Sequence, residues 1–267
     1  MKKDQGLLIM ASHSIGQSGD IPARSLESLR TADLLIFEED RGARAALKAA
    51  GIHRDYLRYN EHNQTQSLET ITENLRAGKS VVYMSDQGCP GLADPGRAIV
   101  NEGIRAQARI TTIPGPSSLT SAIAVCPFDL GEFHFGGFPP RDTAAREAKL
   151  SEWESLGVPV VLMDTPYRLE ALLESCRKIF GDGHKATLAI DLSGEAENVI
   201  NDSLTSIATA TKGTGKLNFV LILDAGRKRG RTSTAPRPAS PGERQPSNHA
   251  PVRNRRPRNR RRTTAGR

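Results

Sequence analysis

The feature that most constrains this chain is a regular alternation of short apolar runs with amphipathic stretches between residues 6 and 226. Strands that alternate with helices at this spacing pair in parallel through right-handed crossovers. The pattern predicts an α/β protein. Its expected strands are Gly6–Ser12, Leu34–Glu38, Ser80–Ser85, Arg109–Ile113, Phe133–Gly136, Pro159–Met163, Thr187–Leu192 and Phe219–Leu223. Its expected helices are Ala23–Ala32, Gly42–Ala50, Leu68–Ala77, Gly96–Gln107, Ser118–Cys126, Ala144–Leu156 and Arg168–Phe180.

The alternation breaks at Pro127–Glu132 and then resumes. We therefore expect two α/β domains, residues 1–128 and 129–226, followed by a tail from 227 to 267. The tail holds fourteen Lys or Arg and one acid, Glu243, a net charge of +13, whereas the first 226 residues hold 23 bases and 29 acids, a net charge of −6. Without aromatic residues the tail cannot bury enough surface to fold, so it is expected to be disordered. Its charge favours an arm that binds RNA or another polyanion; the alternative is a solvated extension without a partner.

Several classes of protein are disfavoured by composition. No apolar run approaches the roughly 18 to 20 residues that span a membrane, and Leu7–Ala11 is too short for the core of a signal peptide. Three cysteines, Cys89, Cys126 and Cys176, lie far apart, without metal-ligand spacing or an even count for disulfides. These features predict a reduced, cytoplasmic protein with neither a membrane segment nor a metal site.

Ligands of open α/β sheets bind beyond the carboxyl ends of the strands. The expected strands of the first domain run into four segments rich in Gly, Pro, Ser and acids, which should share one edge of the sheet. These segments are Ser12–Gly16, Glu38–Arg41, Ser85–Gly96 and Pro114–Ser118.

The residues of these segments suggest a cationic or hydroxylated ligand. Glycines such as Gly88 and Gly115 let the backbone approach a ligand closely. Asp86 and Asp94 supply acceptors for an ammonium group, a ribose hydroxyl or a cationic sulfur, and Ser85–Gly96 contains no Lys or Arg to hold phosphate. The structural alternative makes Ser118 a helix N-cap and Asp94 a turn former. The histidines have no zinc spacing and are expected in loops or at the surface; those considered are His13, His53, His62, His134 and His184.

The order and spacing of four segments resemble the tetrapyrrole methylase family of S-adenosylmethionine-dependent methyltransferases. They are Ser85–Gly96, Ile113–Ser118, Phe133–Pro140 and Asp164–Arg168. The branch around the bacterial 16S rRNA cytidine 2′-O-methyltransferase is the most similar, and this chain resembles a shorter sister group of it. Two segments depart from that branch: Ala11–Gly16 replaces a Pro-Thr-Pro-Ile-Gly-Asn stretch, and Asp191–Glu195 replaces an Arg-Glu-Leu-Thr-Lys stretch.

The resemblance implies two α/β domains with S-adenosylmethionine folded between them, in a homodimer. Carried over one at a time, the expected cofactor-binding residues are Asp86, Gly88, Cys89, Pro90, Pro114, Gly115, Ser117, Ser118 and Met163. Glu38–Arg41 matches a Glu-Asp-x-Arg feature of the family, which makes Glu39 and Asp40 the candidate catalytic bases. The alternative for this pair is an ion pair with Arg41 or Arg44 that holds the loop; His62 and Glu61–Asn63 are lesser candidates.

Three functions follow as hypotheses. The first is methyl transfer to RNA, at a ribose 2′-hydroxyl of rRNA by resemblance, with the basic tail holding the substrate. The second is methyl transfer to a small molecule such as a tetrapyrrole. The third is a non-catalytic RNA-binding or ribosome-associated module. The arginine tail favours the first over the second, and the intact Gly- and Asp-bearing loops disfavour the third.

Overall fold

A computed structural model of the chain describes residues 5–60, 64–216 and 218–226. The strands among these residues form two five-stranded sheets. The described residues fall within a single compact unit. The α/β class expected from the alternation is confirmed. The proposed boundary at residue 128 stays a prediction. Among the described residues, no helix is both long and apolar enough to cross a membrane.

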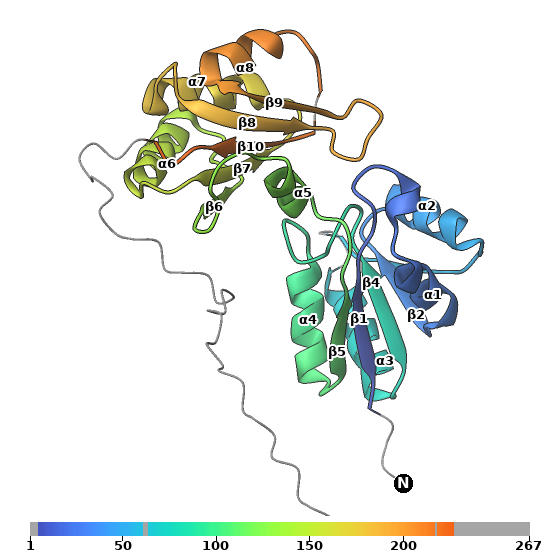
Figure 1. Cartoon of the computed structure of the whole chain (residues 1–267). Coiled ribbons are helices and arrows are strands. Elements are labelled where there is room, and N and C mark those ends of the chain that lie inside the picture. The colour runs from blue at the N-terminus through green and yellow to red at the C-terminus, as the bar shows by residue number, and fades with distance from the viewer. Residues whose placement is uncertain (1–4, 61–63, 217, 227–267) are drawn as a thin grey trace, which may run out of the picture. The chain divides into compact units, whose positions relative to one another are not determined.

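The first sheet is parallel throughout, as the alternation predicted, and its strand order is β3-β2-β4-β1-β5. Helices cover both faces of this sheet (Figure 1). The strands are β1 (Leu7–Ala11), β2 (Leu34–Phe37), β3 (Leu57–Arg58), β4 (Ser80–Met84) and β5 (Arg109–Ile113). The helices are α1 (Ala23–Thr31), α2 (Asp40–Ala50), α3 (Gln64–Arg76) and α4 (Gly96–Arg105), with a 3-10 turn η1 at Ser18–Asp20.

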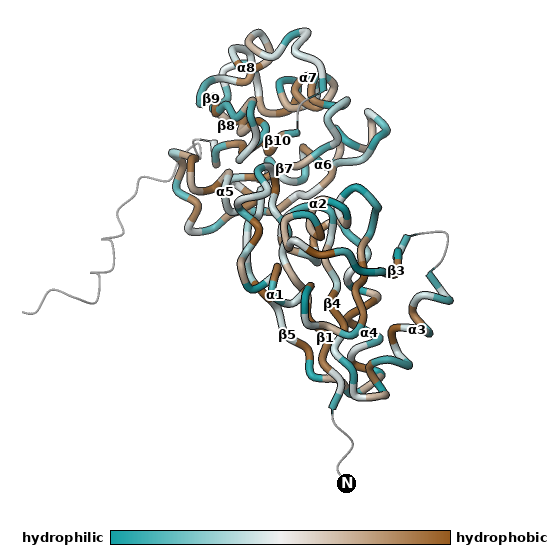
Figure 2. The backbone as a smooth tube through the Cα atoms, turned by 90° about the vertical axis from the view of Figure 1, so that its right-hand side faces the viewer, coloured by the Kyte–Doolittle hydropathy of each residue, from teal (hydrophilic) through white to brown (hydrophobic). Residues whose placement is uncertain are grey.

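Both faces of β1 and β4 are buried, which explains why the sequence shows them as continuous apolar runs. Val82 and Met84 of β4 pack on the face that α1 and α2 cover, and Val81 and Tyr83 pack on the face that α3 and α4 cover. In Figure 2, α3 alternates between hydrophobic and hydrophilic residues, as a helix with one buried side must. The two-residue strand β3 was not anticipated, because so short a run carries no periodicity.

The second sheet has the order β6-β7-β10-β8-β9 and is mixed rather than parallel. Within this sheet, the pair β6 and β7 is the only parallel one among the described strands, and β10 runs antiparallel to both β7 and β8. The strands are β6 (His134–Gly137), β7 (Val160–Asp164), β8 (Lys185–Ile190), β9 (Asn198–Ser203) and β10 (Phe219–Leu223). The prediction of parallel pairing is therefore wrong for this sheet, because β10 lies between β7 and β8 and runs antiparallel to both. The strand β9 and the helix α8 were also missed.

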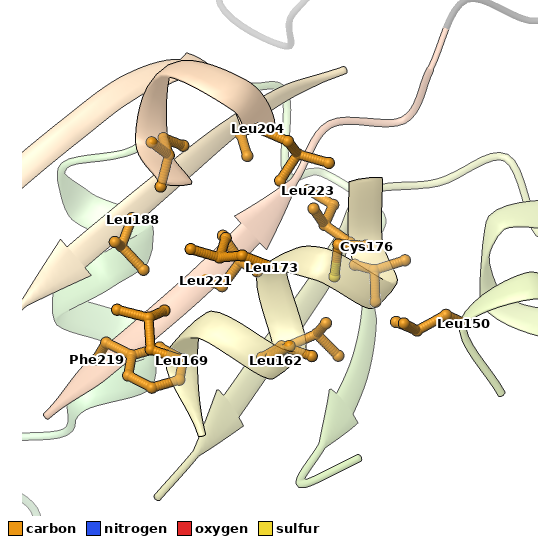
Figure 3. Close-up of a cluster of buried hydrophobic side chains, with 14 of the residues drawn as sticks. Leu150, Leu162, Leu169, Leu173, Cys176, Leu188, Leu204, Phe219, Leu221 and Leu223 are labelled. Carbon is orange, nitrogen blue, oxygen red and sulfur yellow. The ribbon is translucent and has the colours of Figure 1, made fainter. Parts of the chain in front are cut away.

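Helices cover the second sheet on both faces. One face packs against α6 (Thr143–Ser155), α7 (Leu169–Phe180) and α8 (Leu204–Ala210) through a leucine-rich cluster (Figure 3). The other face packs against α5 (Ser118–Ala124), whose buried Ala122 meets Val161, Val220 and Ile222. The hydrophobic packing of α5 is therefore with the second sheet, although it follows the last strand of the first sheet directly.

Candidate functional site

The loops after β1 and β4 leave the first sheet toward opposite faces. These strands are neighbours, yet β1 leads to α1 on one face and β4 leads to α4 on the other. Such a topological switch point is where open α/β sheets bind ligands. All five strands are parallel, so the four expected segments do follow the carboxyl ends of strands at one edge.

Backbone hydrogen bonds join the loops at this switch point. The N–H of His13 donates to the carbonyl oxygen of Gly88 at 2.9 Å, and the N–H of Gly88 donates to the carbonyl oxygen of Ser14 at 3.0 Å. Gly88 has a φ of +69°, and a Cβ there would lie 3.0 Å from Ile15 and 3.2 Å from the carbonyl oxygen of Pro116. The turn thus requires glycine, both for its left-handed backbone and for the close approach of two neighbouring loops.

The loop after β5 is tied to the same place. Both the N–H and the hydroxyl of Ser12 donate to the carbonyl oxygen of Ile113, at 3.2 and 2.8 Å. A Cβ on Gly115 would lie 2.6 Å from the Cβ of Ser12 and 2.7 Å from the ring of Pro22. The structure therefore brings together the expected residues of two loops, with Gly88 buried and the others half-buried or exposed. These residues are Asp86, Gly88, Cys89, Pro90, Pro114, Gly115, Ser117 and Ser118.

Two structural roles expected for this region have different outcomes. Asp94 holds its turn, because its carboxylate accepts from the N–H groups of Gly91 at 2.6 Å and Gly96 at 2.7 Å. Ser118 is not the N-cap of α5: that position belongs to Ser117, whose side chain makes no capping hydrogen bond. The N-cap prediction is wrong by one residue because a run of two serines does not specify which one starts the helix.

Asp86 connects the loop after β4 to the loop after β2. Its Oδ1 atom accepts a hydrogen bond from the backbone N–H of Glu39 at 3.2 Å. Burial raises the pKa of Asp86, and the negative charge of Glu39 adds to this. Burial also raises the pKa of Glu38, helped by the charges of Asp86 and Asp94. Besides Glu39, the three carboxyl groups of Glu38, Asp86 and Asp94 thus lie at this edge, where their negative potential suits a cationic ligand.

This edge fits S-adenosylmethionine by its chemistry. The ligand carries an ammonium and a sulfonium group, which match the carboxylates of Glu38, Asp86 and Asp94. Its ribose hydroxyls can donate to the same carboxylates. The glycines at 88 and 115 keep Cβ atoms out of a place where three loops already meet closely. Asp86 and the turns around Gly88 and Gly115 are the residues that would hold it.

His13 is a residue whose burial beside these loops the sequence did not reveal. It lies in a loop, as expected, but it is only 5% exposed. Its Nδ1 atom lies 3.2 Å from the carbonyl oxygen of Ser14, which can only accept, so a proton on Nδ1 satisfies this contact. Nε2 is buried and has no hydrogen-bond partner among the described residues. A lone histidine in a Ser-His-Ser loop carries no spacing signal that could have predicted this.

The two candidate bases have different surroundings. Asp40 accepts from the hydroxyl of Tyr56 at 3.0 Å and forms an ion pair with Arg58 at 3.1 Å. An ion pair was the alternative expected for Asp40, but with a partner 18 residues away in place of Arg41 or Arg44. Glu39 is exposed, and its carboxylate forms no hydrogen bond or ion pair with any residue that the structure describes. The catalytic role of both stays a prediction.

Met163 lies on β7 of the second sheet, half-buried, in the hydrophobic cluster that also contains Val161, Val220 and Leu119 of α5. A different segment of the second sheet reaches the loop after β1. The N–H of Gln17 donates to the carbonyl oxygen of Ser193 at 3.1 Å, and the hydroxyl of Ser193 bonds the carboxylate of Asp20. The role of Met163 toward the cofactor therefore stays a prediction.

Some expectations fall on residues that the structure does not describe. Glu61, His62 and Asn63 lie in the gap between residues 60 and 64, and the basic tail lies beyond residue 226. Among the described residues, no group of three or more His, Cys, Asp or Glu side chains is arranged to hold a metal ion.

The fold and the site define an α/β protein with one parallel and one mixed sheet. Its candidate ligand site lies at the carboxyl edge of the parallel sheet, in loops that contain glycines and acidic residues. The model of a family described as Tetrapyrrole (Corrin/Porphyrin) Methylases matches residues 8–208. The chain belongs to this tetrapyrrole methylase family.

Curated relatives and solved structures agree with this membership. "Ribosomal RNA small subunit methyltransferase I" of Leptospira borgpetersenii serovar Hardjo-bovis (strain L550) is 32% identical over 92% of this chain and 98% of its own. The protein of the same name from Thermotoga maritima is 36% identical over 66% of this chain and 79% of its own. A diphthine synthase structure, 17% identical, matches with a TM-score of 0.66 over 82% of this chain and 90% of its own, which shows the fold alone.

Proposed function

We propose that this protein transfers a methyl group from S-adenosylmethionine to ribosomal RNA, at a ribose 2′-hydroxyl. The observation that carries the proposal is the ligand edge: three loops joined by backbone hydrogen bonds around Gly88, with three carboxyl groups and a buried histidine beside them. Similarity to rRNA small subunit methyltransferases over 92% of the chain supports the choice of RNA as the acceptor. We further propose that the enzyme acts in the cytoplasm as a homodimer.

When bound, S-adenosylmethionine supplies a methyl group on a positively charged sulfur. The chain's part is to align the acceptor oxygen with that methyl group and to exclude water. Asp86 and the turns at Gly88–Pro90 and Pro114–Ser118 would fix the cofactor, with Met163 enclosing its adenine. Hydrogen bonds already join the loop after β1 to Gly88 and to Ile113, so less ordering is needed on binding.

A ribose hydroxyl is a weak nucleophile and gains from a base that takes its proton. We propose this role for the pair Glu39 and Asp40. Within the pair, Glu39 is favoured by its unengaged carboxylate, whereas the Asp40 carboxylate is held by Tyr56 and Arg58. The basic tail, residues 227–267, would add attraction for the phosphate backbone through its fourteen Lys and Arg side chains.

The test is methyl transfer to isolated small ribosomal subunits from a strain that lacks the gene. The purified protein, with S-adenosylmethionine labelled in its methyl group, should label the rRNA of these subunits and not that of wild-type subunits. Mass mapping of nuclease fragments should find one ribose that is methylated in wild-type rRNA and unmethylated in the deletion strain. Identical maps from the two strains would exclude rRNA methylation and leave a small-molecule acceptor as the next hypothesis.

A further inference from the structure

Two exposed aromatic side chains stand at the carboxyl edge of the second sheet. Phe138 directly follows β6 and is 47% exposed, and Tyr167 follows β7 and is 72% exposed. Since β6 and β7 are parallel neighbours, both loops leave the sheet at the same edge. The other exposed large hydrophobic residues among those described are aliphatic, so these two rings are the exposed aromatic pair of the described chain.

Two arginines hold the turn that carries Phe138. The guanidinium group of Arg168 donates to the carbonyl oxygens of Pro139 at 3.2 Å and Pro140 at 2.7 Å, and it also pairs with Asp164 at 3.0 Å. The buried Arg146 donates to the carbonyl oxygen of Arg141 at 3.0 Å. Because Arg168 adjoins Tyr167 in sequence, its bonds link the two aromatic loops directly. These bonds hold the two loops in place, so the loops would lose little conformational freedom on binding a ligand.

Two positively charged residues lie near these rings, one in space and one in sequence. The Nζ atom of Lys216 lies 4.7 Å from the centroid of the Tyr167 ring, and the exposed Arg141 follows the Phe138 turn. Three acids near these loops already have partners: the Asp142 carboxylate caps α6 by accepting from the N–H of Ala145 at 2.8 Å, Asp164 is paired with Arg168, and the exposed Glu170 accepts from the N–H of Gly213 at 3.4 Å. Cations beside exposed aromatic rings are the combination that binds single-stranded nucleic acid, with rings stacking on bases and cations meeting phosphates.

We propose that Phe138 and Tyr167 form a stacking platform for bases of single-stranded RNA, with Arg141 and Lys216 contacting the adjoining phosphates. The inference rests on the proposed function, which supplies RNA as the substrate, and it adds a recognition surface at the carboxyl ends of β6 and β7. The other possible occupant of this surface is a second copy of the chain, which the sedimentation measurement below distinguishes from RNA.

The experiment measures binding of the full-length protein to a labelled, unstructured RNA of about 15 nucleotides, a length within the range of stacking-type sites. Phe138→Ala and Tyr167→Ala should each weaken binding by about 5- to 150-fold, the range for loss of one base–aromatic stack. Tyr167→Phe keeps the ring and should bind as the wild type does. Ile104→Ala, which removes a side chain 62% exposed on α4, is the matched control and should change nothing.

Cofactor affinity and sedimentation are measured on the same variants. Unchanged cofactor affinity shows that the variants fold. Wild-type RNA binding by the double alanine variant would overturn the platform, and so would equal losses in Tyr167→Phe and Tyr167→Ala. A change in oligomeric state with unchanged RNA binding would overturn it in favour of a self-interface. These results are independent of the rRNA methylation test, so the platform and the proposed function can fail separately.

Discussion

A Cβ atom built on Gly42 would lie 2.5 Å from the Oδ1 atom of Asp86. Gly42 is in the first turns of α2, where glycine costs roughly 0.5 to 1 kcal/mol relative to alanine, so the helix itself would prefer a side chain. Because Gly42 has no side chain, the Asp86 carboxylate can occupy the space next to α2. There it accepts a hydrogen bond from the backbone N–H of Glu39.

Gly42→Ala should therefore weaken cofactor binding by about tenfold, which corresponds to about 1.4 kcal/mol of binding free energy. The physical reason is that the Asp86 carboxylate must move away from its position. The melting temperature should change little, since the gain in helix propensity offsets the displaced hydrogen bond. Isothermal titration with S-adenosylmethionine and a thermal melt check this. Gly183→Ala, which adds a Cβ in open space, is the control and should leave the affinity as it is.

Removal of the Asp86 carboxylate tests the same site directly. Asp86→Ala should weaken binding of S-adenosylmethionine, or of its demethylated product, by about 1 to 3 kcal/mol if the carboxylate accepts a hydrogen bond from the ligand. Ser118→Trp should weaken binding as well, by filling the space beside the first turn of α5. Titration calorimetry that shows unchanged affinity in both variants would remove these loops from the cofactor site.

The raised pKa of Glu38 predicts a particular pH dependence of stability. Burial, with the charges of Asp86 and Asp94, raises the pKa of Glu38 above its ordinary value of 4.5. The folded protein then binds a proton more tightly than the unfolded chain, so this group favours folding at low pH. Its contribution falls as pH rises from 4.5 through the pKa of the folded protein.

Glu38→Gln should flatten this fall, because the amide stays neutral at every pH. Urea unfolding between about pH 4 and about pH 8 should show the variant losing less free energy of unfolding than the wild type as pH rises. Glu69→Gln, an exposed substitution on α3, should leave the slope unaltered. Parallel curves for wild type and Glu38→Gln would mean that burial of Glu38 does not disfavour its charge.

Single substitutions separate catalysis from loop support at Glu39 and Asp40. If Glu39 is the base, Glu39→Gln should lower the single-turnover rate by roughly a hundredfold and spare cofactor affinity, because a base acts on the transition state. Asp40→Asn should lower the melting temperature, since its bonds to Tyr56 and Arg58 are weakened. Near-normal turnover in both variants would exclude the pair and favour catalysis by alignment alone.

Removal of residues 227–267 should weaken RNA binding and reduce its dependence on salt concentration, because fewer phosphates are neutralised. The melting temperature and cofactor affinity should stay as in the full chain, since the segment has no apolar core to contribute. Binding curves at several salt concentrations give the slope. An unchanged slope after truncation would contradict the proposed arm.

The sequence by itself determined four of the five strands of the first sheet, all except β3, and the edge at which its ligand loops lie. Apolar runs such as those at Leu7–Ala11 and Ser80–Met84 are local patterns, and parallel strands necessarily place their carboxyl ends together. The glycines and acids of the loops were therefore recognisable before their contacts were known. The family resemblance added their assignment to a cofactor.

Tertiary structure alone decided which partners these residues meet. The antiparallel entry of β10 beside β7, the burial of His13 and the pairing of Asp40 with Arg58 depend on segments distant in sequence. The same holds for Arg168, which reaches back 28 residues to the carbonyl oxygen of Pro140. Local patterns record burial and periodicity, but a strand or a charged side chain takes its partner from the competition among all long-range contacts, which is settled only when the chain packs.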